Sequence, residues 1–163
     1  MDRPPLPRVL QSPVSHNVAL LLESRIPARL AWVGGDGEPR VAPIWFSWTG
    51  EELVMSTFSG SRKTADLVDG TIVSVSIDTE AFPYRNLSVR GPIVVSQTEG
   101  LTQHYQDAAV RYLGPVTARR WLDFVGSPDQ VLIAMRPRTA VVSDMATESP
   151  FFDRKGEVDG PPG

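Results

Sequence analysis

The residues best suited to chemistry lie in one short stretch, STFSGSRKTADL at positions 56–67. Small hydroxyl side chains come first, then Gly60, and then Arg62 and Lys63 next to each other. A turn that leads into the start of a helix presents free backbone N–H groups, and a glycine lets a ligand approach the backbone closely. Hydroxyl donors, a guanidinium and an ammonium group together suit a dianion. The stretch therefore predicts a site for one phosphate group.

The same residues have a second interpretation. Ser61 is a good N-cap residue, so the stretch could be the start of a capped surface helix with two solvated cations. Lys63 is unusual because the chain has only one other lysine, Lys155, among its sixteen basic residues. If phosphate binds, Thr57 and Ser61 are the hydroxyl donors that we expect beside Lys63.

The composition limits the kinds of chemistry that the chain can carry. Of its 163 residues, 41% are apolar and 21% are charged, which is ordinary for one globular domain. The net charge of −3 gives no reason to expect nucleic acid as a partner. The lack of cysteine excludes disulfides and thiolate sites, and His16 and His104 lie too far apart in sequence for a metal motif. We expect a cytoplasmic protein without a signal peptide or a membrane span.

Common catalytic motifs are missing. No P-loop, HExxH or GxSxG motif occurs, and the glycine-rich VGGDG segment at 33–37 reads as a hairpin turn. An enzyme with this sequence would need a bound cofactor to carry its reaction. The sequence therefore assigns neither a catalytic side chain nor a metal ligand.

The pattern along the chain predicts the elements that must position the phosphate site. Alternating and apolar runs with turn residues between them predict six strands, at 28–35, 40–48, 53–57, 71–78, 85–97 and 129–144. Short helices are expected at 16–24, 62–69 and 99–126, the last in two pieces broken at 114–115. Without a βαβ alternation, the fold class is mainly β (α+β): a small, closed or partly open antiparallel barrel with peripheral helices.

Proline and glycine mark irregular points in this plan. Pro43 places its strand at an edge or a bulge, Gly91 and Pro92 should bend the long strand, and Pro137 interrupts the last strand. Residues 1–15 form a Pro-rich N-terminal arm, residues 16–145 the barrel domain, and residues 146–163 a flexible tail.

Two segments carry a family resemblance. The segment VAPIWFSWTGEELVMSTFSGSRKTADLVDGTIVSVSI at 41–77 and the segment PYRNLSVRG at 83–91 resemble the pyridoxamine 5′-phosphate oxidase-like superfamily of FMN-binding split β-barrels. That superfamily includes deazaflavin (F420)-dependent reductases. The likeness runs from about Arg29 to Val142, and it implies a six-stranded, Greek-key-like split barrel.

The resemblance also implies roles for individual residues. Arg62 and Lys63 would hold the phosphate of the cofactor, with Ser56, Thr57 and Ser61 beside it. Asn86 stands where family members have a residue that reaches the flavin, often from the partner subunit. The strand segment that borders the flavin ring in the family corresponds here to Pro43, Ile44 and Trp45. Each of these residues also has a plain structural interpretation as a bulge, a core residue or a polar residue at a strand start.

The chain departs from the true oxidases in two places. Phe46 stands where those enzymes have a lysine that touches cofactor and substrate, and their C-terminal Trp and Arg pattern is missing. The resemblance therefore does not extend to vitamin B6 phosphate as the substrate.

By this resemblance, the chain is expected to be an FMN-binding oxidoreductase that transfers a hydride or an electron pair between N5 of the flavin and a small organic substrate. The resemblance also implies a homodimer with the cofactor between the subunits, which makes physical sense because a small barrel alone cannot bury a tricyclic ring deeply.

Three alternatives remain open at this point. One is an F420-dependent reductase, for which Arg40, Arg85 or Arg90 are candidates to bind the anionic tail of F420. Another is a non-catalytic protein that binds or stores flavin or haem. The last is a dimerisation domain that has lost its ligand.

Overall fold

In the computed structural model, which describes residues 3–148, alternate residues of the strands face the interior. Strand β5 (Ile72–Asp78) shows the pattern most clearly, because Val73, Val75 and Ile77 are at most 1% exposed while Ser74 and Ser76 face outward. Strand β1 (Ala28–Val33) buries its residues at the same spacing. The alternation of apolar and polar residues in the sequence therefore determines which face of the sheet forms the core.

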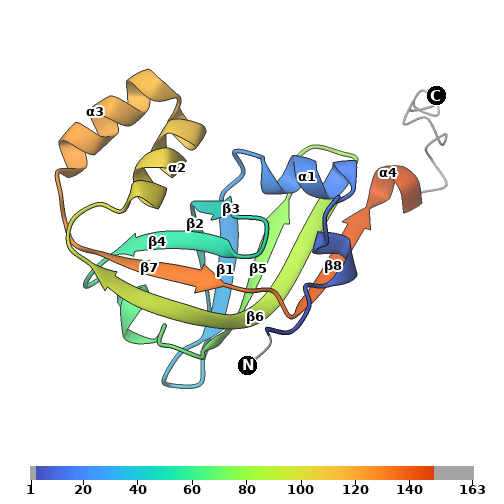
Figure 1. Cartoon of the computed structure of the whole chain (residues 1–163), viewed down its shortest axis with the longest axis horizontal. Helices are drawn as coiled ribbons and strands as arrows, with labels where there is room; N and C mark the ends of the chain where they lie inside the picture. Colours follow the sequence, from blue (N-terminus) through green and yellow to red (C-terminus); the bar gives the residue numbers. More distant parts are fainter. Residues whose placement is uncertain (1–2, 149–163) are drawn as a thin grey trace.

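The strands form one antiparallel sheet that curls into a barrel-like shape (Figure 1). The other strands are β2 (Pro39–Ile44), β3 (Phe46–Trp48), β4 (Leu53–Phe58), β6 (Arg85–Thr98), β7 (Gln130–Met135) and β8 (Thr139–Asp144). Their order is β2-β1-β5-β6-β7-β4-β3, and β8 pairs with β6 beside this path. Because β2 and β3 follow each other directly in the chain, the two ends of this order lie close together. The predicted class, a mostly β antiparallel fold with a few helices, is confirmed.

The predicted number of six strands is wrong, because the described residues contain eight. The run at 40–48 divides at Trp45, so that β2 pairs with β1 while β3 pairs with β4. The run at 129–144 divides around Pro137, so that β7 pairs with β4 and with residues 93–98 of β6, while β8 pairs with residues 85–90 of β6. In each case one continuous run of the sequence forms two strands whose pairing differs on the two sides of a corner. The sequence showed the proline at the second corner, but not the change of partner.

Gly91 lies where β6 passes from one half of the sheet to the other. Residues 85–90 of β6 pair with β8, and residues 93–98 pair with β7. A Cβ at Gly91 would lie 2.3 Å from the backbone oxygen of Arg136. Only glycine allows the two backbones this close approach. The expected bend at Gly91 and Pro92 is therefore a crossing point between two sets of strand partners.

Helices close the ends of the barrel. Helix α1 (His16–Leu22) is capped by Ser15, whose hydroxyl accepts a hydrogen bond from the backbone N–H of Val18 at 3.4 Å. Helices α2 (Gln103–Leu113) and α3 (Pro115–Val125) form a hairpin broken at Gly114, as the sequence predicts. Figure 1 shows this hairpin projecting from the barrel beyond β4. The remaining helical segments are η1 (Arg8–Leu10), η2 (Arg62–Ala65) and α4 (Met145–Glu148).

The described part of the N-terminal arm packs onto the barrel. Leu10 is 1% exposed and belongs to the core cluster, and Arg3 lies 3.6 Å from a carboxylate oxygen of Glu52. The tail expected at 146–163 lies almost wholly outside the described residues. Between residues 3 and 148, no helix has the length and apolar character needed to cross a bilayer.

The Gly91 crossing generates a stability prediction. We expect Gly91→Ala to lower the free energy of unfolding by about 1–3 kcal/mol, because the added methyl group meets rigid backbone. Urea denaturation measures this change. Val94→Thr on the exposed side of the same strand is the control, and we expect it to stay within about 0.5 kcal/mol of wild type. A Gly91→Ala protein as stable as the control would contradict the close approach at residue 91.

Candidate functional site

A cavity of about 420 Å³ lies where β2, β4, η2 and the α2–α3 hairpin meet. Its walls carry most of the residues that the sequence singled out, together with four others. The lining residues are Pro27, Pro43, Ile44, Trp45, Ser56, Thr57, Phe58, Lys63, Tyr105 and Trp121. Lys63 is the only charged residue among them. The cavity therefore has one cationic place on an otherwise neutral wall.

Hydroxyl groups and Lys63 form the polar part of the wall. Ser56 and Thr57 come from β4, whose alternation leaves Thr57 8% exposed. The Ser56 hydroxyl lies 3.0 Å from the hydroxyl of Thr102, which caps α2. Among residues 3–148, no carboxylate lies within ion-pair distance of Lys63. The ammonium charge of Lys63 is thus available to an anion in the cavity.

Ser61 occupies the N-cap position of η2, but its side chain does not cap this turn. Its hydroxyl lies 3.3 Å from the Thr57 hydroxyl and makes no capping bond to η2. The helix expected at 62–69 is also much shorter in the structure, where only four residues form a single 3₁₀ turn. Such a short turn contributes little dipole, so Lys63 and the hydroxyls must supply the attraction for an anion. The sequence missed this because a local pattern cannot tell a 3₁₀ turn from the first turn of a helix.

The other predicted residues divide into two groups. Pro43, Ile44 and Trp45 line the cavity at the corner between β2 and β3, as expected. Arg62 is exposed and is absent from the lining, although it stands next to Lys63. The structure thus separates the two cations that the sequence places together.

Asn86 lies on a different surface, the outer face of β6. Its amide nitrogen donates to the Ser76 hydroxyl at 2.7 Å, and its amide oxygen accepts from the Ser88 hydroxyl at 2.9 Å. Asn86 does not line the cavity of its own chain. A contact with a cofactor held by a partner subunit stays a prediction.

Aromatic rings form the part of the wall that the sequence described least well. The Trp45 ring stacks on Tyr112 with centroids 5.2 Å apart and an angle of 9° between the planes. Trp45 also contacts Tyr105 and Trp121, with centroids 5.6 Å and 6.4 Å away. The indole N–H of Trp121 donates to the Tyr105 hydroxyl at 2.9 Å. Burial raises the pKa of Tyr105, so its phenol stays neutral at physiological pH.

Phe58, Tyr105 and Pro27 were not singled out from the sequence. A signal for the aromatic wall existed in the RYLGPVTARRW segment at 111–121, which places aromatic residues on a helical insertion. Which of its rings turn toward the barrel depends on how the α2–α3 hairpin docks.

Asp66 anchors the segment that carries Lys63. Its carboxylate accepts a hydrogen bond from the backbone N–H of Gly35 at 3.0 Å and one from the indole N–H of Trp32 at 3.2 Å. Arg40 lies 3.4 Å away. The backbone bond from Gly35, followed by the bond from Trp32, lowers the pKa of Asp66. The carboxylate thus fixes the end of η2 against the β1–β2 turn, and Asp66 is not among the residues that line the cavity.

The cavity suits a phosphorylated ring compound. An ammonium group with neighbouring hydroxyls complements a phosphate, and the aromatic side chains complement a flat ring. A tricyclic cofactor is large for an open cavity of about 420 Å³, so a second wall would be needed to cover it.

The sequence matches one known family. Residues 14–143, well over half of the chain, match the family model described as pyridoxamine 5′-phosphate oxidase. A search of curated proteins found no significant match.

Several solved structures share the fold of this chain. An F420 reductase is 28% identical, with 74% of this chain and 93% of that chain covered and a TM-score of 0.56. The conserved hypothetical protein Rv2991 from Mycobacterium tuberculosis is 19% identical, with 86% and 90% covered and a TM-score of 0.61. A FAD and haem binding protein from Mycobacterium smegmatis is 22% identical, with 80% and 71% covered and a TM-score of 0.54. The last two comparisons support the fold alone.

The Asp66 anchor predicts a pH-dependent contribution to stability. Because the folded-state pKa of Asp66 lies below its ordinary value of 3.8, the contribution is complete above pH 3.8 and is lost as the pH falls through the folded-state pKa. We expect Asp66→Asn to be less stable than wild type at neutral pH, with a smaller difference below pH 3.8. Urea denaturation at both pH values measures this. Glu38→Gln, exposed in the same region, is the control, and an equal Asp66→Asn deficit at both pH values would rule out a role for the charge.

Proposed function

This chain belongs to the pyridoxamine 5′-phosphate oxidase family, and from this premise we propose that it is an FMN-binding oxidoreductase acting on a small organic substrate. The observation that supports the proposal most directly is that one cavity has hydroxyls and Lys63, which forms no ion pair with any of residues 3–148, in one part of its wall and aromatic rings in another. When bound, the flavin supplies the redox chemistry by exchanging a hydride or an electron pair at N5.

In this proposal the residues of the chain bind the cofactor and orient it. Lys63 attracts the phosphate, and Thr57 and Ser56 donate hydrogen bonds from β4. Ser61, held beside Thr57 at 3.3 Å, is the next available hydroxyl. Pro43, Ile44 and Trp45 border the ring, and Tyr105 and Trp121 keep water from the cavity. No side chain of the cavity is required as a proton donor, so none is assigned a catalytic role.

Vitamin B6 phosphate is not the proposed substrate despite the family name. Phe46, at the position of the oxidase lysine, is 1% exposed and belongs to the core cluster. It has neither a charge nor access to the cavity. The reaction proposed here therefore shares the cofactor class and the fold with the oxidases, but not their substrate.

F420 is the second candidate cofactor, favoured by the 28% identity to an F420 reductase. Two arginines considered for its anionic tail are already paired with carboxylates. Arg40 lies 2.7 Å from Asp36, and Arg85 lies 3.2 Å from Asp144. The exposed Arg62 is better placed for a tail that leaves the cavity near Lys63. A haem storage role has less support, because the cavity lining contains no His, Cys or Met.

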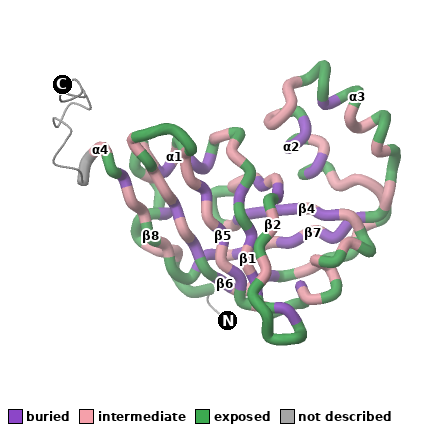
Figure 2. Tube along the Cα trace, turned by 180° about the vertical axis from the view of Figure 1, so that it is seen from behind, coloured by how far each residue is buried: buried purple, intermediate pink, exposed green. Residues whose placement is uncertain are grey.

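We also propose that two chains form a homodimer through the outer face of the sheet. Figure 2 shows the molecule from behind, so that β1, β2 and β5 are on the near side. Apolar residues are exposed on this face, with Val33 and Val41 62% and 68% exposed, and the Arg29–Asp78 ion pair lies on the same face. Pro43 belongs both to this face and to the cavity, so a partner seated on the face would also cover the cavity. Asn86 of the partner subunit would then reach the cofactor by the route that the family resemblance implies.

The phosphate assignment predicts a selective loss of affinity. We expect Arg62→Ala combined with Lys63→Ala to weaken FMN by about 10- to 100-fold, because a charge-assisted hydrogen bond is worth roughly 1.5–3 kcal/mol. Riboflavin, which has no phosphate, should change by no more than about twofold if neither cation contacts the ring system. Flavin fluorescence titration of the purified apoprotein measures both affinities.

Arg62→Ala alone is the matched control. Because Arg62 is exposed and lies outside the cavity lining, we expect it to account for the smaller part of the loss. Equal weakening of FMN and riboflavin in the double variant would refute the phosphate site.

The dimer predicts the effect of a charge on the outer face. We expect Val41→Asp to yield monomers and to weaken FMN binding, because a two-fold interface would bury the new carboxylate on both chains. Val116→Asp on α3, at a residue that is 70% exposed, should leave the mass unchanged. Light scattering after size exclusion measures both variants. A dimer that persists in Val41→Asp would place the interface elsewhere.

A further inference from the structure

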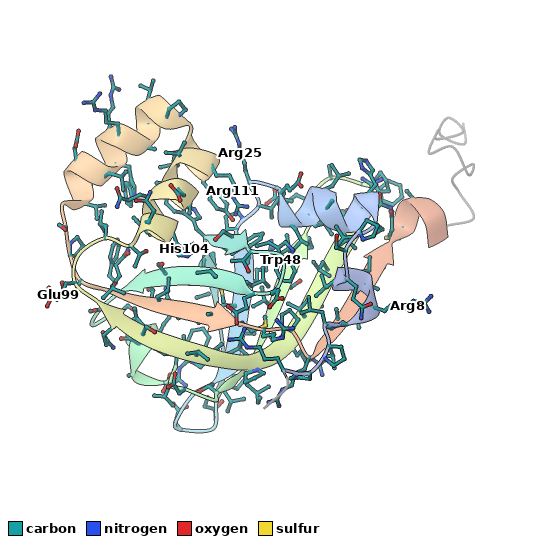
Figure 3. The ribbon with its side chains drawn as sticks, in the orientation of Figure 1. Arg8, Arg25, Trp48, Glu99, His104 and Arg111 are labelled. Carbon is teal, nitrogen blue, oxygen red and sulfur yellow. The ribbon has the colours of Figure 1, made fainter. Side chains whose placement is uncertain are left out.

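A second pocket lies between α1, β3 and α2, apart from the proposed cofactor cavity. Its volume is about 260 Å³, and it is lined by Val14, Ala19, Leu22, Glu23, Ser47, Trp48 and Arg111. None of these residues lines the first cavity. Figure 3 labels Arg111, Trp48 and the nearby Arg25 in this part of the molecule.

Arg111 is held rigidly at this pocket. Its guanidinium donates to the backbone oxygens of Leu22 and Phe46 and to the Tyr112 hydroxyl, the bond to Leu22 being 3.3 Å long. It also lies over the rings of Phe46 and Tyr112, at 4.8 Å and 4.7 Å from their centroids. These contacts fix the position of the charge before any ligand arrives.

The acceptors of Arg111 are all uncharged. A guanidinium has five N–H donors, and the bonds above use three of them. Its Nε is buried without a partner. Other half-buried arginines are paired: Arg40 with Asp36, Arg85 with Asp144, and Arg136 with Glu51. Within residues 3–148, no carboxylate lies within ion-pair distance of Arg111. Its positive charge therefore makes no direct ion pair within the described residues, although Glu23 lines the same pocket.

The remaining surroundings define the kind of counterion that would fit. Val14, Ala19, Leu22 and Trp48 provide an apolar surface, and the Ser47 hydroxyl adds a polar group. A volume of about 260 Å³ suits a molecule smaller than a typical drug.

We propose that the pocket between α1 and α2 binds a small organic monocarboxylate, with the carboxylate at Arg111 and the apolar part against Trp48 and Leu22. Glu23 is the one acidic residue in the lining and carries the same charge as this ligand. It therefore opposes binding by repulsion. The proposal is independent of the cofactor, because the two sites share no lining residue.

Benzoate is a suitable probe, and benzamide is its neutral counterpart of the same shape. The experiment is a titration of the full-length protein, free of cofactor, followed by NMR of the tryptophan indole N–H groups. Trp48 reports the proposed pocket, while Trp45 and Trp121 report the other cavity. We expect saturable shifts of the Trp48 signal with benzoate at about millimolar concentration, and at least tenfold weaker binding of benzamide.

Two variants decide which pocket is used. Ala19→Leu fills the pocket with a residue that also favours helix, so we expect benzoate binding to fall at least tenfold in a folded protein. Lys63→Met removes the cation of the other cavity and should leave the Trp48 shifts unchanged. Glu23→Gln should tighten benzoate several-fold by removing the like charge. Arg111→Gln is a poorer test, because it also breaks the bonds that join α1 to β3.

Each contrary outcome overturns the proposal. These outcomes are the absence of saturable Trp48 shifts, equal binding of benzoate and benzamide, and benzoate binding that survives Ala19→Leu. Loss of binding in Lys63→Met, with shifts at Trp45 and Trp121, would place benzoate in the cofactor cavity instead. Failure of FMN to bind would leave all of these outcomes unaffected.

Discussion

The unpaired ammonium of Lys63 on an otherwise neutral cavity wall is the feature on which the proposed function depends. A carboxylate beside it would cancel the attraction for a phosphate. The nearby acid, Asp66, instead directs its oxygens to the backbone N–H of Gly35, the indole of Trp32 and the guanidinium of Arg40. The same contacts that hold η2 in place therefore leave Lys63 free, so the fold provides both the position and the charge of the site.

The aromatic part of the cavity depends on a second set of long-range contacts. Trp45 stands at the corner where one run of residues changes from pairing with β1 to pairing with β4. This corner turns the Trp45 ring toward the α2–α3 hairpin, where Tyr105, Tyr112 and Trp121 surround it. The corner that interrupts the strand therefore also places Trp45 among the rings of the cavity wall.

Arg111 and Tyr112 connect this wall to the rest of the molecule. The Tyr112 hydroxyl accepts from Arg111 and donates to the backbone oxygen of Ile26, so α2 is tied to the start of β1. Burial raises the pKa of Tyr112, which keeps this hydroxyl able to donate. The ring of Tyr112 stacks on Trp45, which lines the first cavity, and its hydroxyl accepts from Arg111, which lines the second pocket. Tyr112 therefore joins a lining residue of one pocket to a lining residue of the other, although the two pockets have no lining residue in common.

The sequence by itself determined the features that rest on local chemistry. Alternation at 71–78 set the inner and outer faces of β5, Gly114 marked a helix boundary, and the hydroxyl and lysine pattern at 56–63 indicated the polar wall of the cavity. Only the tertiary structure decided that the runs at 40–48 and 129–144 each divide into two strands. It also decided that Lys63 lines the cavity while Arg62 does not. Within residues 3–148, it pairs Arg40 and Arg85 with carboxylates but gives Arg111 no such partner. The reason is physical: a residue's backbone preference is set mainly by its sequence neighbours, whereas strand partners, ring stacking and charge pairing depend on residues far away in the chain that the fold brings within a few ångströms.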